Sequence, residues 1–337
     1  MPIVSYFCVK KGLVDVPNDR KIHKSPIPRL GGVAIWLCTI FTFIILVLLS
    51  WDYPHGNGLS GILIGGSLIF LLGMVDDLYN LTPKFKLFVQ IGAALIAFLL
   101  GVRIEILFNP FGNPIILGIL SLPLTILWLV GITNAMNFID GVDGLAGGVT
   151  AISAVTLAVV AIYTHQPISA LAAAILAGAM MGFLLFNFHP AKIFMGDSGA
   201  LFSGFTLAAL SVTGVLKTVT VTILLPIMIL AVPLMDISYS IIRRLFKKTS
   251  PFVADADHIH HRLLKAGLSH NRTVVIFYIL CIAAGSVATS FVGAQRLYFI
   301  LVLLILSIML VLSRLSKLRK LNELHDSLIS QDDPSLK

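Results

Sequence analysis

The stretch Asn134–Gly148, NAMNFIDGVDGLAGG, stands between two long apolar runs, Ile115–Gly131 and Ala146–Tyr163. It carries two carboxylates and two amides, namely Asp140, Asp143, Asn134 and Asn137. A desolvated carboxylate is costly unless it is paired or bound to a cation. A tight polar turn, the alternative, would need neither two Asp three residues apart nor four glycines. The stretch therefore predicts a functional site where the hydrocarbon ends.

The composition of the whole chain places that site in a membrane protein. Of 337 residues, 57% are hydrophobic and only 12% are charged, whereas a soluble chain carries about 25% charged residues. We expect one all-α, polytopic domain over residues 1–337, because lipid leaves the backbone no partner outside a helix. The net charge of +8 suits anionic lipid rather than nucleic acid. Three scattered cysteines predict no disulfide framework.

Apolar runs of about 20 residues mark the spans. We predict ten, at residues 33–50, 59–75, 84–101, 115–131, 146–163, 169–187, 198–214, 219–239, 274–292 and 296–313. Proline lacks the N–H that a helix interior needs. We therefore expect kinks at Pro123, Pro226 and Pro233.

The basic residues set the orientation of these spans. With a cytoplasmic N-terminus, all Lys and Arg except Arg103, Lys217 and Arg296 fall on the cytoplasmic side. That side also receives the large loop 240–273 and the tail 314–337. The outer loops carry little chemistry, so we predict a cytoplasmic active site.

The second predicted span closes on two adjacent carboxylates, Asp76 and Asp77, within GMVDDLYNLTPK. Adjacent carboxylates repel, which suits a general base, a metal site or both. The alternative is a solvated helix end, which the helix macrodipole disfavours. Lys84 and Lys86 follow within reach and are candidates for holding a phosphate.

The segment FMGDSG, residues 194–199, has the composition of a phosphate or metal turn. Gly196 allows close backbone approach, and Asp197 suits a hard cation. The next backbone N–H groups begin a helix, and the N-terminus of a helix can bind an anion. The alternative is that Asp197 or Ser198 only caps that helix. Phe194 is either an interfacial anchor or a stacking platform.

Two basic clusters complete the cytoplasmic side. The large loop carries His258, His260, His261 and Arg262. Three interpretations are open: zinc ligands together with a nearby Asp, a patch that binds phosphate, or a solvated loop without a ligand. The segment Asn18–Gly32, which contains Lys24, is a positive-inside anchor or a phosphate clamp.

Hard-cation ligands, phosphate cradles and basic residues at the ends of distant helices together indicate phosphoryl chemistry. The chain has no P-loop, GxGxxG or GxSxG motif. A transporter is the rival interpretation, but its ionisable residues would lie nearer mid-membrane.

Four segments in order, GMVDDLYNLTPKFKL, NAMNFIDGVDGLAGG, FNFHPAKIFMGDSG and HIHHRL, resemble the polyprenyl-phosphate N-acetylhexosamine-1-phosphate transferases. The resemblance runs from about Lys11 to Leu264. It implies a bacterial cytoplasmic-membrane enzyme that moves a sugar-1-phosphate from a UDP-sugar to undecaprenyl phosphate, releasing UMP. It also implies Mg2+ as cofactor, with Mn2+ as an alternative, and a homodimer.

Within that superfamily, His258-Ile259-His260-His261-Arg262 resembles the GlcNAc-1-phosphate branch, which begins teichoic acid, O-antigen or similar polymers. The muramoyl-pentapeptide branch carries three consecutive histidines and is the alternative within the class. The family usually has eleven spans, one of them before the Asn18 segment. Only Met1–Val9 precedes that segment here, so we expect a misassigned start or a truncated chain.

The resemblance also implies roles for single residues. The catalytic set would be Asp76, Asp77, Asp197, His260 and His261. Asp76 would act as base toward the lipid phosphate, which would attack the donor directly. A covalent phospho-Asp intermediate is the alternative. The metal set would be Asp197, Asp140 and Asp77. Substrate would be bound by Asn134, Asn137, Asp140, Asp143, Asn187, Phe194, Arg262, Lys84, Lys24 and His258, with Phe194 stacking on uracil.

Overall fold

The computed structural model describes residues 1–15, 26–49, 58–107, 109, 113–215, 224–246, 258–307 and 309. The chain divides into two units, Met1–Tyr298 and Phe299–Lys337. The helices of the first unit are α1 (Pro2–Lys10), α2 (Gly31–Leu49), α3 (Leu59–Tyr79), α4 (Pro83–Leu99), α5 (Ser121–Ile139), α6 (Leu145–Tyr163), α7 (Pro167–Asn187), α8 (Gly196–Val215), α9 (Leu224–Ile229), α10 (Ala231–Phe246), α11 (Ile259–Lys265) and α12 (His270–Ser290). A further helix, Gln295–Ser307, follows α12.

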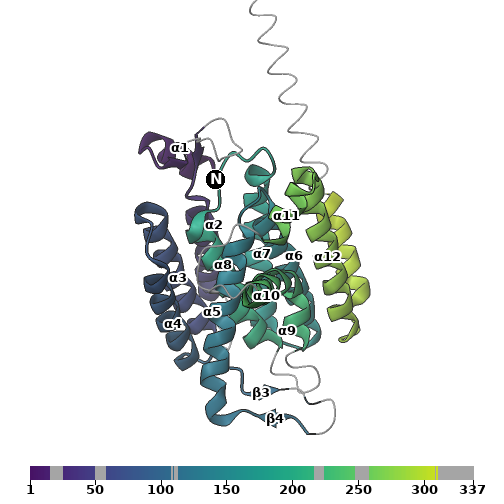
Figure 1. Ribbon diagram of the computed structural model, residues 1–337. Helices are drawn as coiled ribbons and strands as arrows, with labels where there is room; N and C mark the ends of the chain where they lie inside the picture. Colours follow the sequence, from purple (N-terminus) through teal and green to yellow (C-terminus); the bar gives the residue numbers. More distant parts are fainter. Residues whose placement is uncertain are drawn as a thin grey trace, which may run out of the picture. The chain divides into compact units, whose positions relative to one another are not determined.

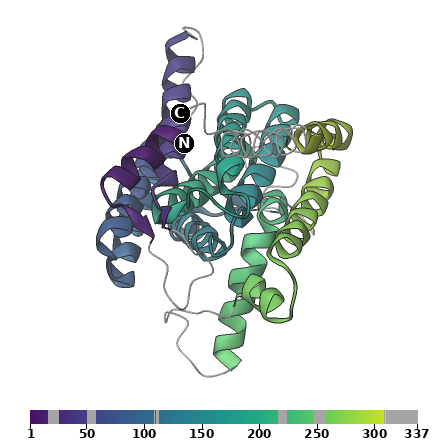
Figure 2. The ribbon, with the colours of Figure 1, turned by 90° about the horizontal axis from the view of Figure 1, so that it is seen from above.

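α8 is the helix that joins the parts of the first unit. It contacts α3, α5, α2 and α6, and α6 in turn contacts α7 and α12. Figures 1 and 2 show α3 and α4 at one side of this unit and α12 at the other. α6 is buried along almost its whole length, because Gly147, Gly148 and a run of Ala, Ser and Thr let its neighbours approach closely.

Five of the described helices are long and apolar enough to cross a membrane. They are Leu59–Tyr79, Gly118–Ile139, Leu145–Tyr163, Pro167–Asn187 and His270–Ser290. Two shorter apolar helices, Gly31–Ile45 and Gln295–Ser307, fall at other predicted spans. The structure therefore confirms a polytopic helical membrane protein. The number of ten spans and the tail 314–337 stay predictions, and the tail lies outside the described residues.

One predicted span is wrong in its boundaries. The span expected at 115–131 contains a short strand and a 3-10 turn, and α5 runs instead from Ser121 to Ile139. Pro123 therefore falls in the first turn of the helix, where a missing N–H has no cost, and no kink is needed. The shift also places Asn134 and Asn137 inside α5 rather than in a loop.

A second predicted span, 219–239, is two helices over its described part. α9 ends at Ile229, Leu230 forms a turn, and α10 begins at Ala231. Pro233 has no N–H to donate to the Ile229 carbonyl. The Ser153 hydroxyl of α6 donates to that carbonyl instead, at 3.1 Å. The proline pair thus breaks the helix rather than only bending it.

The remaining elements are short. Two antiparallel pairs, β1 (Val14–Asp15) with β2 (Ile27–Pro28) and β3 (Ile106–Leu107) with β4 (Ile115–Ile116), interrupt the all-α pattern. Within 240–273, predicted as a loop, the structure has the end of α10, all of α11 and the start of α12. Figure 1 shows α11 at the upper end of the first unit and β3–β4 at the lower end.

Candidate active site

The site forms where the C-terminal end of α3 meets the N-terminal end of α8. A Cβ on Gly73 would lie 2.5 Å from the Ser198 Cα, so only glycine lets the helices meet one turn before the carboxylates. Asp77 then caps α8. Its Oδ1 accepts the Asp197 N–H at 2.8 Å, and its Oδ2 accepts the Ser198 hydroxyl at 2.7 Å and the Ser198 N–H at 3.1 Å. A carboxylate at a helix N-terminus also favours the macrodipole.

Lys86 of α4 joins the two remaining carboxylates of this junction. Its Nζ lies 2.7 Å from Asp76 Oδ2 and 3.0 Å from Asp197 Oδ2. Asp76 Oδ1 accepts the Leu81 N–H at 2.7 Å, so both oxygens of Asp76 are engaged. The Asp76 side chain is 8% exposed and that of Asp197 is 31% exposed. Asp197 is therefore the carboxylate of this pair that a substrate reaches more readily.

The polypeptide before α2 is fastened to the turn that carries Asp197. Phe194 donates its N–H to the Pro28 carbonyl at 2.8 Å, and Gly31 and Gly32 donate to Phe194 and Met195 carbonyls at 2.9 Å each. A Cβ on Gly32 would lie 2.2 Å from the Gly199 nitrogen. Gly31 and Gly32 thus let the N-terminal segment line the site.

The turn after α5 brings Asp140 toward the same junction. Burial, then the charges of Asp197, Asp77 and Asp143, raise the pKa of Asp140 to about 8. The junction thus carries more negative charge than its neighbours offset. Carboxylate oxygens are ligands that Mg2+ prefers, so Asp140 and Asp197 are the candidates for holding a magnesium ion.

The predicted metal set is not assembled as a whole. Asp77, Asp140 and Asp197 are not among the described groups whose ligand atoms lie within 4.8 Å of one another. Both oxygens of Asp77 accept hydrogen bonds from the start of α8. Asp77 thus holds in place the turn that carries Asp197, and its role as a metal ligand stays a prediction.

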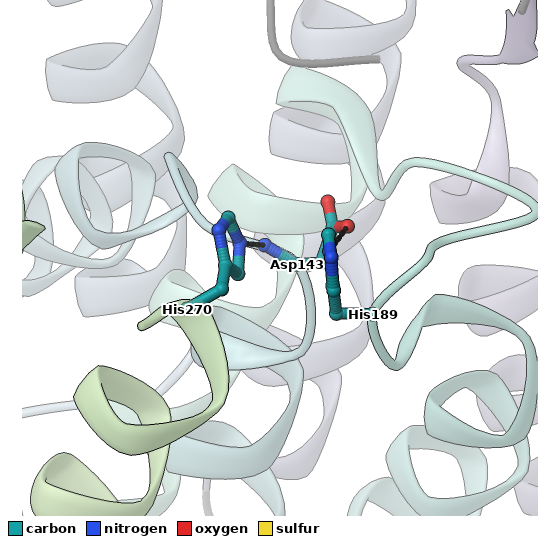
Figure 3. A group of neighbouring side chains, drawn as sticks. All are labelled: Asp143, His189 and His270. Carbon is teal, nitrogen blue, oxygen red and sulfur yellow. Dashed lines mark hydrogen bonds and ion pairs between the residues drawn. The ribbon is translucent and has the colours of Figure 1, made fainter. Parts of the chain in front are cut away.

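Asp143, on the next turn of the same loop, is held from two other segments. Its Oδ2 lies 2.8 Å from His189 Nδ1 and 3.2 Å from the Ala191 N–H. Its backbone N–H donates to His270 Nε2 at 3.2 Å. Figure 3 shows the three side chains converging from the loop before α6, the segment after α7 and the start of α12.

These three residues have ligand atoms within 4.8 Å of one another. However, the rings of His189 and His270 are stacked, with centroids 4.5 Å apart and planes at 22°. A metal lies in the plane of each imidazole that binds it, and two nearly parallel planes do not meet at one ion. We therefore interpret the group as a hydrogen-bonded clamp on Asp143.

Asn187, predicted to bind substrate, is buried and ties two loops together. Its Oδ1 accepts the Gly144 N–H and its Nδ2 donates to the Ile193 carbonyl, both at 2.9 Å. Asn134 is similarly engaged one turn below the site, where its amide pairs with Gln90 of α4 at 2.7 Å. Both amides thus act in this structure as links between segments.

The histidine segment lies over the Asp140 turn. A Cβ on Gly141 would be 2.8 Å from His260 Nε2. His260 is fully buried, and neither ring nitrogen has a hydrogen-bond partner among the described residues. Burial, then repulsion from His261, lowers the pKa of His260 to about 4. Its two unpartnered nitrogens are suited to a substrate hydroxyl or phosphate oxygen, and because His260 is fully buried such a contact requires the site to open when substrate binds.

The other predicted contacts are placed as follows. Phe194 is half-buried beside Met195, Asn137 is half-buried in α5, and Lys84 is exposed at the start of α4. The Arg262 guanidinium lies 5.4 Å from the centre of the Tyr239 ring. Lys24 lies outside the described residues. The roles of these residues stay predictions.

The sequence reasoning missed Asp236, His189, His270 and Gln90. Asp236 left a signal, because an ionisable residue inside a predicted span is a functional candidate by default. His189 stood within the quoted segment FNFHPAKIFMGDSG but was given no role. His270 and Gln90 carry no local signal, since only the packing of distant helices brings them to their partners.

The fold and site define a class: membrane-embedded enzymes whose carboxylates, histidines and lysine meet at helix ends. The model for "Glycosyl transferase family 4" matches residues 59–215. The chain is 38% identical, over 83% of its length and 77% of the relative, to a probable undecaprenyl-phosphate N-acetylglucosaminyl 1-phosphate transferase of Bacillus subtilis.

Two further relatives agree. The chain is 32% identical to a decaprenyl-phosphate N-acetylglucosaminephosphotransferase of Mycolicibacterium smegmatis, over 86% of this chain and 80% of that one. It is 31% identical to an undecaprenyl-phosphate alpha-N-acetylglucosaminyl 1-phosphate transferase of Escherichia coli, over 86% of this chain and 79% of that one. The chain therefore belongs to glycosyl transferase family 4, as the four motifs predicted, and is a transferase.

Proposed function

We propose that this protein transfers GlcNAc-1-phosphate from UDP-GlcNAc to undecaprenyl phosphate, giving undecaprenyl-diphosphate-GlcNAc and UMP. The observation that carries the proposal is the junction of α3, α4 and α8, where Lys86 bridges Asp76 and Asp197. Relatives with 31–38% identity that are named for GlcNAc-1-phosphate transfer support the choice of sugar. The acceptor follows from the same names.

In the proposed reaction an oxygen of the lipid phosphate attacks the β-phosphorus of UDP-GlcNAc. The bond from that phosphorus to the bridging oxygen breaks, and the electron pair leaves on UMP. Asp197 and Asp140 would hold Mg2+, which when bound would offset charge on the diphosphate and on the leaving UMP. Asp77 keeps Asp197 in place through the cap of α8.

Lys86 would bind the phosphates as an ammonium. Because both oxygens of Asp76 accept hydrogen bonds, Asp76 becomes a base only after Lys86 moves to the substrate. A phosphate has its second pKa near about 6, so the lipid phosphate is largely ionised at neutral pH and needs little help from a base. Direct attack is therefore the preferred course, and a covalent phospho-Asp is the alternative.

Asp143 and Phe194 would take the uracil end of the donor. The clamp from His189 and Ala191 holds Asp143 Oδ2 and leaves its other oxygen to read the base. His260, His261 and Arg262 would hold the sugar and diphosphate. The working face would be cytoplasmic, in the bacterial inner membrane, since UDP-sugars are supplied there and the basic residues gather on that side.

UMP release by the purified protein tests the proposal. We expect release with undecaprenyl phosphate, Mg2+ and UDP-GlcNAc together, and none when any one is omitted. Release with UDP-MurNAc-pentapeptide instead would move the substrate to the muramoyl-pentapeptide branch. Binding of UDP-sugars without release of UMP from any donor would contradict the enzyme and favour a transporter.

A further inference from the structure

A buried carboxylate–imidazole pair, Asp236 and His258, has no part in the mechanism above. Asp236 of α10 is 1% exposed and His258 is 4% exposed. Asp236 Oδ2 lies 2.8 Å from His258 Nδ1, and Asp236 Oδ1 accepts the Ile259 N–H at 2.8 Å. A carboxylate is unfavourable in such a place unless both oxygens are satisfied, and these two contacts satisfy them.

The two contacts act on α11, a helix that needs outside support. α11 has seven residues, and an isolated helix of that length is unstable. Its N-cap residue, His258, makes no capping hydrogen bond with its side chain. Asp236 supplies one from another helix, because Ile259 is the first residue of α11. The position of α11 thus depends on a carboxylate of α10.

The imidazole of His258 transmits this position to the active site. Its ring stacks on Phe138 of α5 at 5.1 Å between centroids and lies parallel to the His260 ring at 5.8 Å. The Ser240 hydroxyl is a second group at His258 Nδ1, at 3.2 Å. His260 in turn lies against the Gly141 turn with both nitrogens unpartnered among the described residues.

We propose that Asp236 is a positioning residue for the UDP-sugar: through His258 it seats α11 so that His260 faces the Asp140–Asp143 turn. Asp236 does not touch the substrate. Its acceptor oxygen keeps the proton of His258 on Nδ1, which fixes the orientation of the ring. This inference rests on the proposed function, because the ligand of His260 is taken to be the UDP-sugar.

The test compares Asp236→Asn with the wild type in the UMP-release assay, varying each substrate separately. The asparagine keeps an acceptor for the Ile259 N–H but turns a donor toward His258 Nδ1. We expect the KM for UDP-GlcNAc to rise about 10- to 100-fold, the range for losing a hydrogen bond to a charged group. The KM for undecaprenyl phosphate should not change.

Thr125→Val is a matched control for a purely structural loss. Thr125 is fully buried, and its hydroxyl accepts the Ile104 N–H at 3.0 Å at the far end of α5. A smaller folded fraction lowers kcat and leaves both KM values unchanged, which is the result expected for this control. The same result for Asp236→Asn would overturn the proposal.

A double-mutant cycle tests whether Asp236 acts through His258. We expect Asp236→Asn to add nothing to the effect of His258→Asn, whereas independent effects would multiply. Multiplying effects would contradict the proposal. If Asp236→Asn does not fold, Ser240→Ala takes its place in the cycle, with an expected rise in KM of about 2- to 10-fold. An unchanged KM there would also overturn it. A wild type that releases no UMP would instead refute the proposed function.

Discussion

Gly32→Ala should disable the enzyme, because the single added methyl group would overlap atoms at the start of α8. The added Cβ would lie 2.2 Å from the Gly199 nitrogen and 2.5 Å from the Ser198 hydroxyl oxygen, whereas ordinary contact begins at 3.4 Å. The start of α2 and the start of α8 must therefore move apart by about 1 Å. Both partners are backbone or a hydroxyl committed to Asp77, so neither can simply rotate away.

The magnitude follows from that displacement. Overpacking costs about 1–3 kcal/mol, and losing the Gly32 hydrogen bond to Met195 adds about 1 kcal/mol. Asp197 lies in the displaced turn, and a misplacement of about 1 Å can reduce activity about 100-fold. We expect both a lower unfolding temperature and about a 100-fold lower rate of UMP release.

Gly92→Ala is the control for this prediction. Gly92 lies within α4, and nothing stands within 4 Å of a Cβ placed on it. The substitution should stabilise the helix by about 0.5–1 kcal/mol and leave UMP release unchanged. Wild-type activity of Gly32→Ala, measured beside this control, would refute the packing of α2 against the Asp197 turn.

Three further predictions concern the charged groups. Lys86→Met should lower stability by about 2–4 kcal/mol without divalent ions, as two charge-assisted hydrogen bonds are lost. Mg2+ should restore part of this loss in thermal unfolding, and an equal loss with and without Mg2+ would contradict the carboxylate pairing. Asp77→Asn should weaken the cap of α8 by about 1 kcal/mol and raise the Mg2+ concentration needed for half-maximal activity; an unchanged requirement would count against Asp77 as the residue that orients Asp197. His260 binds its proton less readily when folded, so stability should fall by up to about 3 kcal/mol as the pH drops from about 6.5 to about 4. His260→Gln should flatten that part of the pH profile, and an unaltered profile would contradict the burial of His260.

The sequence alone predicted the helices whose ends are marked by local chemistry. Predicted spans such as 146–163 and 169–187 lie within two residues of α6 and α7, because long apolar runs between polar turns leave little freedom. The span at 115–131 was placed too early, since its apolar run includes β4, and hydropathy does not distinguish strand from helix. At 219–239 the prolines were recognised, but the group that donates to the freed Ile229 carbonyl, Ser153, comes from another helix and could not be identified from the local sequence.

The site was predicted in its parts but not in its connections. Asp76 was expected to act as a base and Asp77 to belong to the metal set, yet Asp76 meets Lys86 and Asp77 caps α8. Neighbours in a helix point about 100° apart, so they reach different partners. Lys84 and Lys86 were ranked together, and only the latter reaches the carboxylates. Asp236 was passed over because its partner is 22 residues away in sequence.

The rate of UMP release as a function of Mg2+ concentration, for wild type and Asp197→Asn, tests the central claim most directly. An amide carries no charge and is a poorer ligand for a hard cation than a carboxylate. We predict Mg2+-dependent release by the wild type, and a rate at least about 100-fold lower for the variant that more Mg2+ does not restore. Release by Asp197→Asn at the wild-type rate and with the same Mg2+ requirement would contradict a reaction centre at the junction of α3, α4 and α8.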